Sequence, residues 1–267
     1  MARSLLRHCT LFLATLLTCA AAVHAEPPKH IVFLISESEY DTKTTLPAFA
    51  KAELEPRGFT CTFCIAPEAH PDEFPGTDAL KSADLVFISV RRQAPSEETM
   101  ALLHAHLAAK KAIVGIRTAS HAFAPPLSKN PPPARPGHAY WPEFDHEVLG
   151  GNYANHYGVG IPTIAKILPE AMNHPVLQGI APGEFPVKSH LYKNPSLPAS
   201  DTILMTGRME NRPEVEPIAW VNTAHGGRVF YTSLGSPGDF EIPQFPRLLL
   251  NGICWALNVL PEDNPPH

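Results

Sequence analysis

The chain has 267 residues, of which 44% are hydrophobic and 18% charged, and its formal net charge at pH 7 is −5. This length is typical of one large globular domain, and the acidic balance excludes a basic nucleic-acid-binding surface. Beyond the N-terminal segment, no apolar run is long enough to span a membrane.

Residues 1–25 are predicted to be a secretory signal peptide. Two arginines precede a short apolar stretch at 11–22, and Ala25 provides the small residue expected before a cleavage site. We therefore expect an exported protein, periplasmic or extracellular, whose mature part is a single α/β domain at residues 26–267.

The mature part alternates strand-like and helix-like segments. Apolar runs predict strands at 31–35, 59–65, 84–90, 112–116, 163–168, 202–205, 218–222 and 228–233. Helices are predicted at 45–57, from Ser96 as N-cap to Lys111, and at 245–257. The alternation predicts an open, mostly parallel sheet flanked by helices, of the flavodoxin-like type.

Two local patterns interrupt this alternation. Residues 125–142 are rich in proline, which removes backbone donors, so this segment is predicted to be a loop. Cys61 and Cys64 form a C-x-x-C pattern, but on a strand residues three apart point to opposite faces. We interpret both cysteines as packing residues, with a redox or metal role as the less favoured alternative.

The order of the predicted strands indicates where a ligand would bind. In open α/β sheets the binding crevice lies at the carboxyl ends of the strands. The first strand is followed by residues 36–40, the third by Arg91 and Arg92, and the fourth by residues 117–121, and all three exits are polar.

The segment 141–160 follows the fourth exit and is unusually rich in glycine, aromatic and polar residues. This composition suits a loop that binds a small polar ligand. A surface loop ordered by its own hydrogen bonds would have the same residue types, so both interpretations stay open.

Several motifs together resemble the ThuA-like (trehalose-utilisation) family. They lie at residues 115–119, 150–158, 217–221, 226–235 and 252–256, and the resemblance extends over about residues 29–260. It implies a fold similar to that of class I glutamine amidotransferases and a carbohydrate or keto-sugar derivative as small-molecule ligand.

The same resemblance predicts which chemistry is missing. An amidotransferase needs a cysteine nucleophile on the turn after a central strand, and this turn carries Arg117. ThuA-like proteins commonly have histidine at this turn and after the late Leu-Gly, where this chain has Arg117 and Ser236. We expect no glutamine amidotransferase activity.

Residue types in these segments suggest a set of site residues. His156 is nominated as general acid or base, because histidine can titrate near neutral pH, and Arg117 as the group that binds a carbonyl or oxyanion. Further candidates for substrate contacts are Tyr40, Arg91, His121, Asn155 and Tyr157, and the resemblance to the ThuA-like family adds His190 and Tyr192. The alternatives are a structural role for His156 and an internal ion pair of Arg117 with an acid such as Glu37.

No cofactor is expected, and no metal ligand is assigned. Asp145, His146, His156 and His190 are ligand types, so a divalent metal is a less favoured alternative. Three functions remain open: an exported carbohydrate-processing isomerase or hydrolase, a non-catalytic sugar-binding domain, and a structural or partner-binding envelope domain. The sequence does not specify the oligomeric state.

Overall fold

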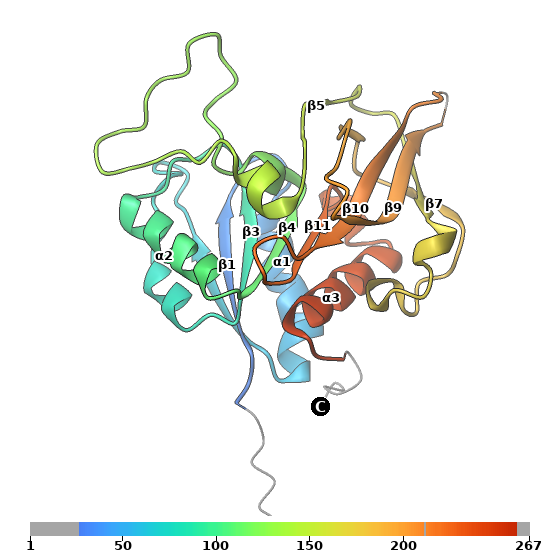
Figure 1. The fold of residues 1–267 in the computed structure, drawn as a ribbon, viewed down its shortest axis with the longest axis horizontal. Helices are drawn as coiled ribbons and strands as arrows, with labels where there is room; N and C mark the ends of the chain where they lie inside the picture. Colours follow the sequence, from blue (N-terminus) through green and yellow to red (C-terminus); the bar gives the residue numbers. More distant parts are fainter. Residues whose placement is uncertain (1–26, 211, 261–267) are drawn as a thin grey trace, which may run out of the picture.

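The computed structural model describes residues 27–210 and 212–260, so the predicted signal peptide lies outside the described residues. A nine-stranded sheet has the order β2-β1-β3-β4-β11-β10-β9-β6-β7 (Figure 1). Its parallel part contains β1 (His30–Ser36), β2 (Thr60–Ile65), β3 (Leu85–Val90), β4 (Ala112–Ile116) and β11 (Val229–Thr232). This confirms the predicted α/β fold with a mostly parallel sheet.

The other four strands extend the sheet in antiparallel fashion. They are β10 (Val215–Asn222), β9 (Thr202–Met209), β6 (Thr163–Ile167) and β7 (Glu184–Val187). A separate two-stranded ribbon joins β5 (Asn155–His156) to β8 (Tyr192–Lys193). The sequence did not indicate β5, β7 or β8, because β5 and β8 have only two residues each and β7 contains Pro186, so none of them has a clear strand pattern.

Within the described residues, three α-helices flank the sheet: α1 (Thr42–Phe49), α2 (Glu97–Ala108) and α3 (Gln244–Leu257). Short 3₁₀ or π turns lie at Ala50–Leu54, Glu55–Arg57, Thr77–Lys81, Arg117–His121, Asp145–Leu149, Pro169–Ala171, Pro175–Leu177 and Pro237–Asp239. The predicted N-cap is confirmed, since the side chain of Ser96 accepts a hydrogen bond from Thr99 N. The predicted helix at 45–57 begins earlier, at Thr42, and continues after Phe49 as π and 3₁₀ turns.

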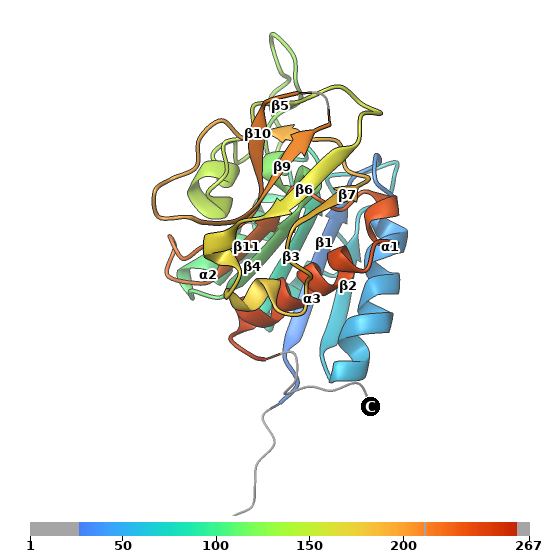
Figure 2. The same ribbon diagram turned by 90° about the vertical axis from the view of Figure 1, so that its right-hand side faces the viewer.

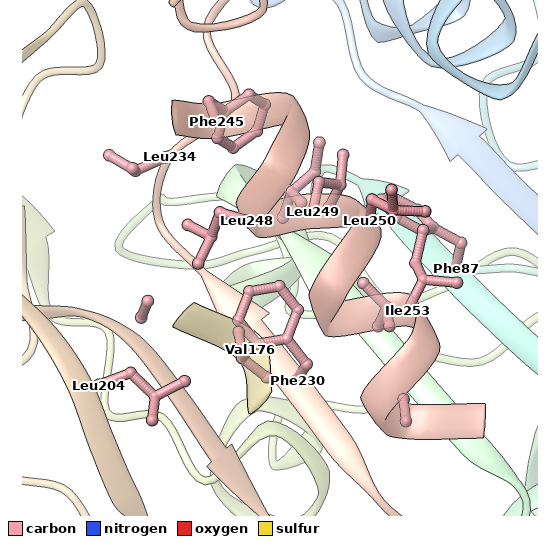
Figure 3. Packing of buried hydrophobic residues seen from close by; sticks show 14 of the residues in the cluster. Phe87, Val176, Leu204, Phe230, Leu234, Phe245, Leu248, Leu249, Leu250 and Ile253 are labelled. Carbon is pink, nitrogen blue, oxygen red and sulfur yellow. The ribbon is translucent and has the colours of Figure 1, made fainter. Parts of the chain in front are cut away.

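The sheet separates two hydrophobic cores. One contains buried residues of α1 and α3, and the other those of α2 and the turn at Asp145–Leu149 (Figure 2). Figure 3 shows Leu249, Leu250 and Ile253 of α3 in this core together with Phe87 of β3 and Phe230 of β11. Because both faces of the sheet are buried, the register of its strands is fixed. The carboxyl ends of the parallel strands therefore lie along the same edge of the sheet.

The two cysteines of β2 behave as their spacing predicts. Cys61 packs with the core under α1 and α3, whereas Cys64 belongs to the opposite core. Burial raises the pKa of Cys61 to about 12 and that of Cys64 to about 11. Both thiols are therefore protonated at neutral pH, and neither is an activated nucleophile.

Within residues 27–210 and 212–260, no helix is both long and apolar enough to cross a membrane.

Candidate functional site

A cavity of about 380 Å³ lies at the carboxyl ends of β1, β3 and β4, beneath the β5–β8 ribbon. Figure 1 shows β5 above the sheet, on the side toward which β1 points. The volume falls within the usual range of small-molecule sites. The cavity is lined by Glu39, Tyr40, Arg91, Arg92, His121, Leu127, Tyr153, Asn155, His156, Val159, His190 and Tyr192.

Seven of the nine predicted site residues line this cavity, and two do not. Arg117 lies beneath its floor, and Tyr157 lies on the far side of the ribbon. The other lining residues were not predicted as site residues: Glu39, Arg92, Leu127, Tyr153 and Val159. Two of them could have been predicted from the sequence. Arg92 follows Arg91 at a strand exit, and Tyr153 lies inside the glycine-rich segment.

Arg117 occupies the sharp turn at the end of β4. Its φ of 47° lies in the left-handed region, which non-glycine residues rarely adopt and which costs about 1–3 kcal/mol. The phenol of Tyr231 donates a hydrogen bond to the Arg117 carbonyl oxygen at 2.7 Å and so supports this conformation. The turn directs the Arg117 side chain under the cavity instead of into the sheet.

The guanidinium of Arg117 is enclosed between two aromatic rings. Its central carbon lies 4.5 Å from the ring centroid of Tyr40 and 4.2 Å from that of Tyr192. Nη1 donates to the carbonyl oxygens of Ser233, at 2.6 Å, and His190, at 3.0 Å. Each desolvated cation–π contact contributes about 2 kcal/mol, which offsets part of the cost of burying the charge.

No carboxylate among the described residues forms an ion pair with Arg117, although the side chain is fully buried. The ion pair with Glu37 considered above is not formed. Glu37 accepts hydrogen bonds from Tyr40 N at 2.7 Å and Thr42 N at 2.9 Å, and so orders the start of α1. The Nε–H of Arg117 is buried without a hydrogen-bond partner.

Two cavity histidines lie among these arginines and are held neutral. Burial, followed by the charges of Arg92, Arg91 and Arg117, lowers the pKa of His121 to about 2. Burial and the charge of Arg117 lower the pKa of His190 to about 4. At neutral pH both rings act as hydrogen-bonding and stacking groups, and His121 stacks on Tyr153 at 4.4 Å.

The β5–β8 ribbon brings His156 opposite Tyr192 in an antiparallel pair. The His156 ring also contacts that of His190 edge-on, with centroids 4.7 Å apart. Its Nδ1 lies 2.6 Å from the carbonyl oxygen of Tyr157, which can only accept, so Nδ1 carries the hydrogen and the neutral ring has Nε2 as its acceptor. His156 is exposed at the cavity, unlike His121.

Tyr157 lies away from the cavity because successive side chains of an extended chain point to opposite sides. Its hydroxyl donates to Glu216 Oε1 at 2.7 Å, and Lys193 Nζ lies 4.6 Å from its ring centroid. Tyr157 thus attaches the ribbon to β10.

Asp239 anchors the segment that carries His190. The carboxylate is fully buried and accepts hydrogen bonds from Lys188 N at 2.6 Å and Ser189 N at 3.1 Å. Its second oxygen accepts from Gly235 N at 2.9 Å and Ser236 N at 3.0 Å, after the exit of β11. Ser236 therefore belongs to a structural turn that joins this exit to the cavity wall.

Asp145 orders the glycine-rich segment before β5. Its Oδ2 accepts a hydrogen bond from Tyr153 N at 2.8 Å, and Oδ1 lies 2.0 Å from where a side chain at Gly151 would begin. Only glycine permits this approach. Burial raises the pKa of Asp145 to about 7, and Oδ1 has no hydrogen-bond partner. The segment is therefore ordered by its own contacts, and it places Tyr153 at the cavity wall.

The described part of the chain contains no group of three or more His, Cys, Asp or Glu side chains placed to hold a metal ion. A second cavity of about 490 Å³ adjoins the first at the carboxyl ends of β1 and β2. Glu39 and Arg91 line both cavities and form an ion pair of 2.8 Å between them.

The mostly parallel sheet with flanking helices, the left-handed turn after β4 and the cavity above it define an α/β protein of the flavodoxin-like type. The family model described as "ThuA: Trehalose utilisation" matches residues 29–256. The chain therefore belongs to the ThuA family. No curated protein matches it significantly in sequence.

Solved structures share the fold at low sequence identity. A ThuA-like protein from Bacteroides uniformis is 16% identical, with a TM-score of 0.63 and coverage of 90% of this chain and 98% of the other. A ThuA-like protein from Parabacteroides merdae is 18% identical, with a TM-score of 0.60 and coverage of 87% and 91%. A cytoplasmic protein from Salmonella typhimurium is 14% identical, with a TM-score of 0.54 and coverage of 85% and 98%.

Proposed function

We propose that this protein binds and acts on a carbohydrate or keto-sugar derivative in the cavity beneath the β5–β8 ribbon. The observation that carries the proposal is the convergence of three strand exits and the ribbon on one cavity with several aromatic and polar side chains. Such walls suit a sugar, which offers both hydroxyl groups and apolar ring faces. The family description, trehalose utilisation, supports a carbohydrate ligand.

His156 is the proposed general acid or base. Its Nε2 is the acceptor nitrogen of the neutral ring, because Nδ1 donates to the Tyr157 carbonyl. The lowered pKa values of His121 and His190 keep those two rings from donating protons as imidazolium at neutral pH. A proton taken from or given to a sugar hydroxyl would therefore pass through His156.

Arg117 is proposed to support the site from beneath. Its side chain is fully buried, and it contacts Tyr40, His190 and Tyr192, which do line the cavity. The guanidinium thus holds these three side chains in place and adds positive potential at the floor, where a substrate oxygen would gain negative charge.

The test is a thermal-shift screen of the mature protein with mono-, di- and keto-saccharides, with and without divalent metals, followed by mass spectrometry for products. We expect a stabilising sugar that is converted by the wild type and bound but not converted by His156→Asn. The matched control is His70→Asn, an exposed histidine on a loop outside this cavity, which should keep full turnover. Full activity of His156→Asn would contradict the assignment of His156.

A second candidate is a sugar-binding domain without catalysis. It is favoured by the turn after β4, where the residue at the nucleophile position is a buried arginine. This function predicts stabilisation by a sugar with no product, and any product made by the wild type but not by His156→Asn would exclude it.

Export is also proposed, on the basis of residues 1–25 alone. Expression of the full chain in a bacterial host, followed by N-terminal sequencing, should give a mature protein that starts at Glu26 in the periplasm or medium. An uncleaved chain retained in the cytoplasm would contradict this proposal.

A further inference from the structure

The cavity has a charge opposite to that of the whole chain. Arg91 and Arg92 line it, and Arg117 lies under its floor, whereas Glu39 is the only carboxylate among the described residues that line it. Glu39 is already paired with Arg91 at 2.8 Å. Since the chain carries a formal net charge of −5, this concentration of guanidinium groups is a local feature and not a consequence of composition.

Arg92 is the arginine best placed to meet a ligand. It is partly buried at the cavity wall, and Nη1 donates to the Pro125 carbonyl oxygen at 2.7 Å. No carboxylate among the described residues is paired with it. Burial lowers the pKa of Arg92, with a further contribution from the charge of Arg91, so its charge is poorly compensated.

The backbone holds Arg92 in the same unusual conformation as Arg117. Their φ angles are 52° and 47°, and each residue lies at the exit of a neighbouring parallel strand. Strained non-glycine residues cluster at functional sites, where the fold maintains a geometry that the local sequence resists. Two such arginines at adjacent strand exits indicate that their placement serves the cavity.

Other groups in the cavity do not neutralise these charges. His121 and His190 are uncharged at neutral pH, and burial raises the pKa of Tyr192 well above its ordinary value, so its phenol is neutral as well. Of the arginines that line the cavity, Arg91 has a buried Nε–H without a hydrogen-bond partner among the described residues. The cavity therefore has an unsatisfied donor and an excess of positive charge, both of which an anionic acceptor would compensate.

We infer that the ligand carries a carboxylate or phosphate group next to its sugar ring, and that Arg92 binds this oxyanion. The inference that the ligand contains a sugar ring rests on the function proposed above. The inference that it carries an oxyanion rests on the arginines alone. A guanidinium binds either group through two parallel hydrogen bonds, so the shared chemistry is that of a planar or tetrahedral oxyanion.

The experiment compares matched ligands on the mature protein by calorimetry at low salt. The probes are glucose, galactose and mannose, their uronic acids, their 6-phosphates, and inorganic phosphate. We expect an acid or phosphate of one sugar to bind at least about tenfold more tightly than the neutral sugar, with weaker binding at high salt. The relative affinities of uronic acid and sugar phosphate identify which oxyanion the site prefers.

Variants test whether Arg92 causes the preference for an anionic over a neutral sugar. Arg92→Gln should bring the ratio of the anionic-ligand affinity to the neutral-sugar affinity close to one, and Arg92→Lys should restore part of the wild-type ratio. Lys43→Gln is the matched control, because this exposed lysine lines the adjacent cavity and pairs with Glu68. It should leave the preference unchanged.

Each contrary result has a separate meaning. Equal affinity for neutral and anionic sugars, or a preference that survives Arg92→Gln, would overturn the oxyanion inference and leave sugar binding intact. Binding of inorganic phosphate with no sugar of any charge, an adventitious ion only, would overturn the sugar ligand and the present inference together.

Discussion

Arg117 Nη1 donates to the carbonyl oxygen of His190 at 3.0 Å, and this bond joins the exit of β4 to the cavity wall before β8. The two residues are 73 positions apart in the chain. The same guanidinium lies between the rings of Tyr40 and Tyr192, so one side chain connects three segments around the cavity.

Arg117→Lys should destabilise the protein although the charge is kept. An ammonium group cannot stack on two rings while it donates to the carbonyls of Ser233 and His190. We expect a loss of about 2 kcal/mol in the free energy of unfolding, measured by urea denaturation. Arg208→Lys, in an exposed ion pair with Glu184, is the control and should change stability by less than about 0.5 kcal/mol. Equal effects of the two variants would contradict the bridging role of Arg117.

Removal of the Asp239 carboxylate should release the segment that carries His190. Asp239→Ala leaves the backbone N–H groups of Lys188 and Gly235 without their acceptor in a buried position. We expect a loss of roughly 3 kcal/mol in the free energy of unfolding and faster hydrogen exchange at residues 188–190. Asp239→Asn keeps one oxygen and should cost less, whereas Asp78→Ala at an exposed site should be nearly neutral. Unchanged exchange in Asp239→Ala would show that other contacts hold the segment.

Asp145 should make stability depend on pH in a defined direction. Its pKa is raised from 3.8 to about 7 by burial, so the folded state binds a proton that the unfolded state releases in this range. The free energy of unfolding should therefore fall as pH rises from about 4 to about 7, by at most about 1.4 kcal/mol per pH unit from this group.

Asp145→Asn tests this dependence, because the amide can still accept the hydrogen bond from Tyr153 N. The variant should show a flatter stability profile between the two pKa values and should be more stable than the wild type near pH 7. Denaturant titrations at several pH values provide the measurement. Asp201→Asn is a useful comparison, since burial raises the pKa of Asp201 from 3.8 to about 6. Removal of this carboxyl group should flatten the same stability profile between about pH 4 and about pH 6. A wild-type slope that persists in both variants would contradict the assignment.

Gly252→Ala should destabilise the packing of α3 on the sheet. A side chain at Gly252 would begin 2.1 Å from the ring of Phe230, which is fully buried in β11. Overpacking of this kind costs about 1–3 kcal/mol, which exceeds the gain of about 1 kcal/mol from alanine in a helix. Thermal unfolding should show a lower Tm, and Phe230→Leu combined with Gly252→Ala should recover part of the loss in a double-mutant cycle. An additive pair would show that the two positions do not clash.

The sequence by itself determined the strands of the parallel sheet and the edge at which its exits meet. Buried strands such as β1 and β3 consist almost entirely of apolar residues, and the N-cap at Ser96 has a local hydrogen-bonding cause, so both can be predicted without tertiary information. Strand exits also predicted Tyr40, Arg91 and His121, which line the cavity. The other cavity residues named in advance came from the glycine-rich segment (Asn155 and His156) and from the family resemblance (His190 and Tyr192).

Only the tertiary structure decided what each of these side chains does. His156 faces the cavity and Tyr157 faces away because β5 pairs with β8, a contact between segments that share no sequence pattern. The left-handed turn at Arg117 sends its charge beneath the floor, where Tyr40 and Tyr192 enclose it. Long-range pairing and backbone conformation set these directions, and neither is encoded in the residue types of any single segment.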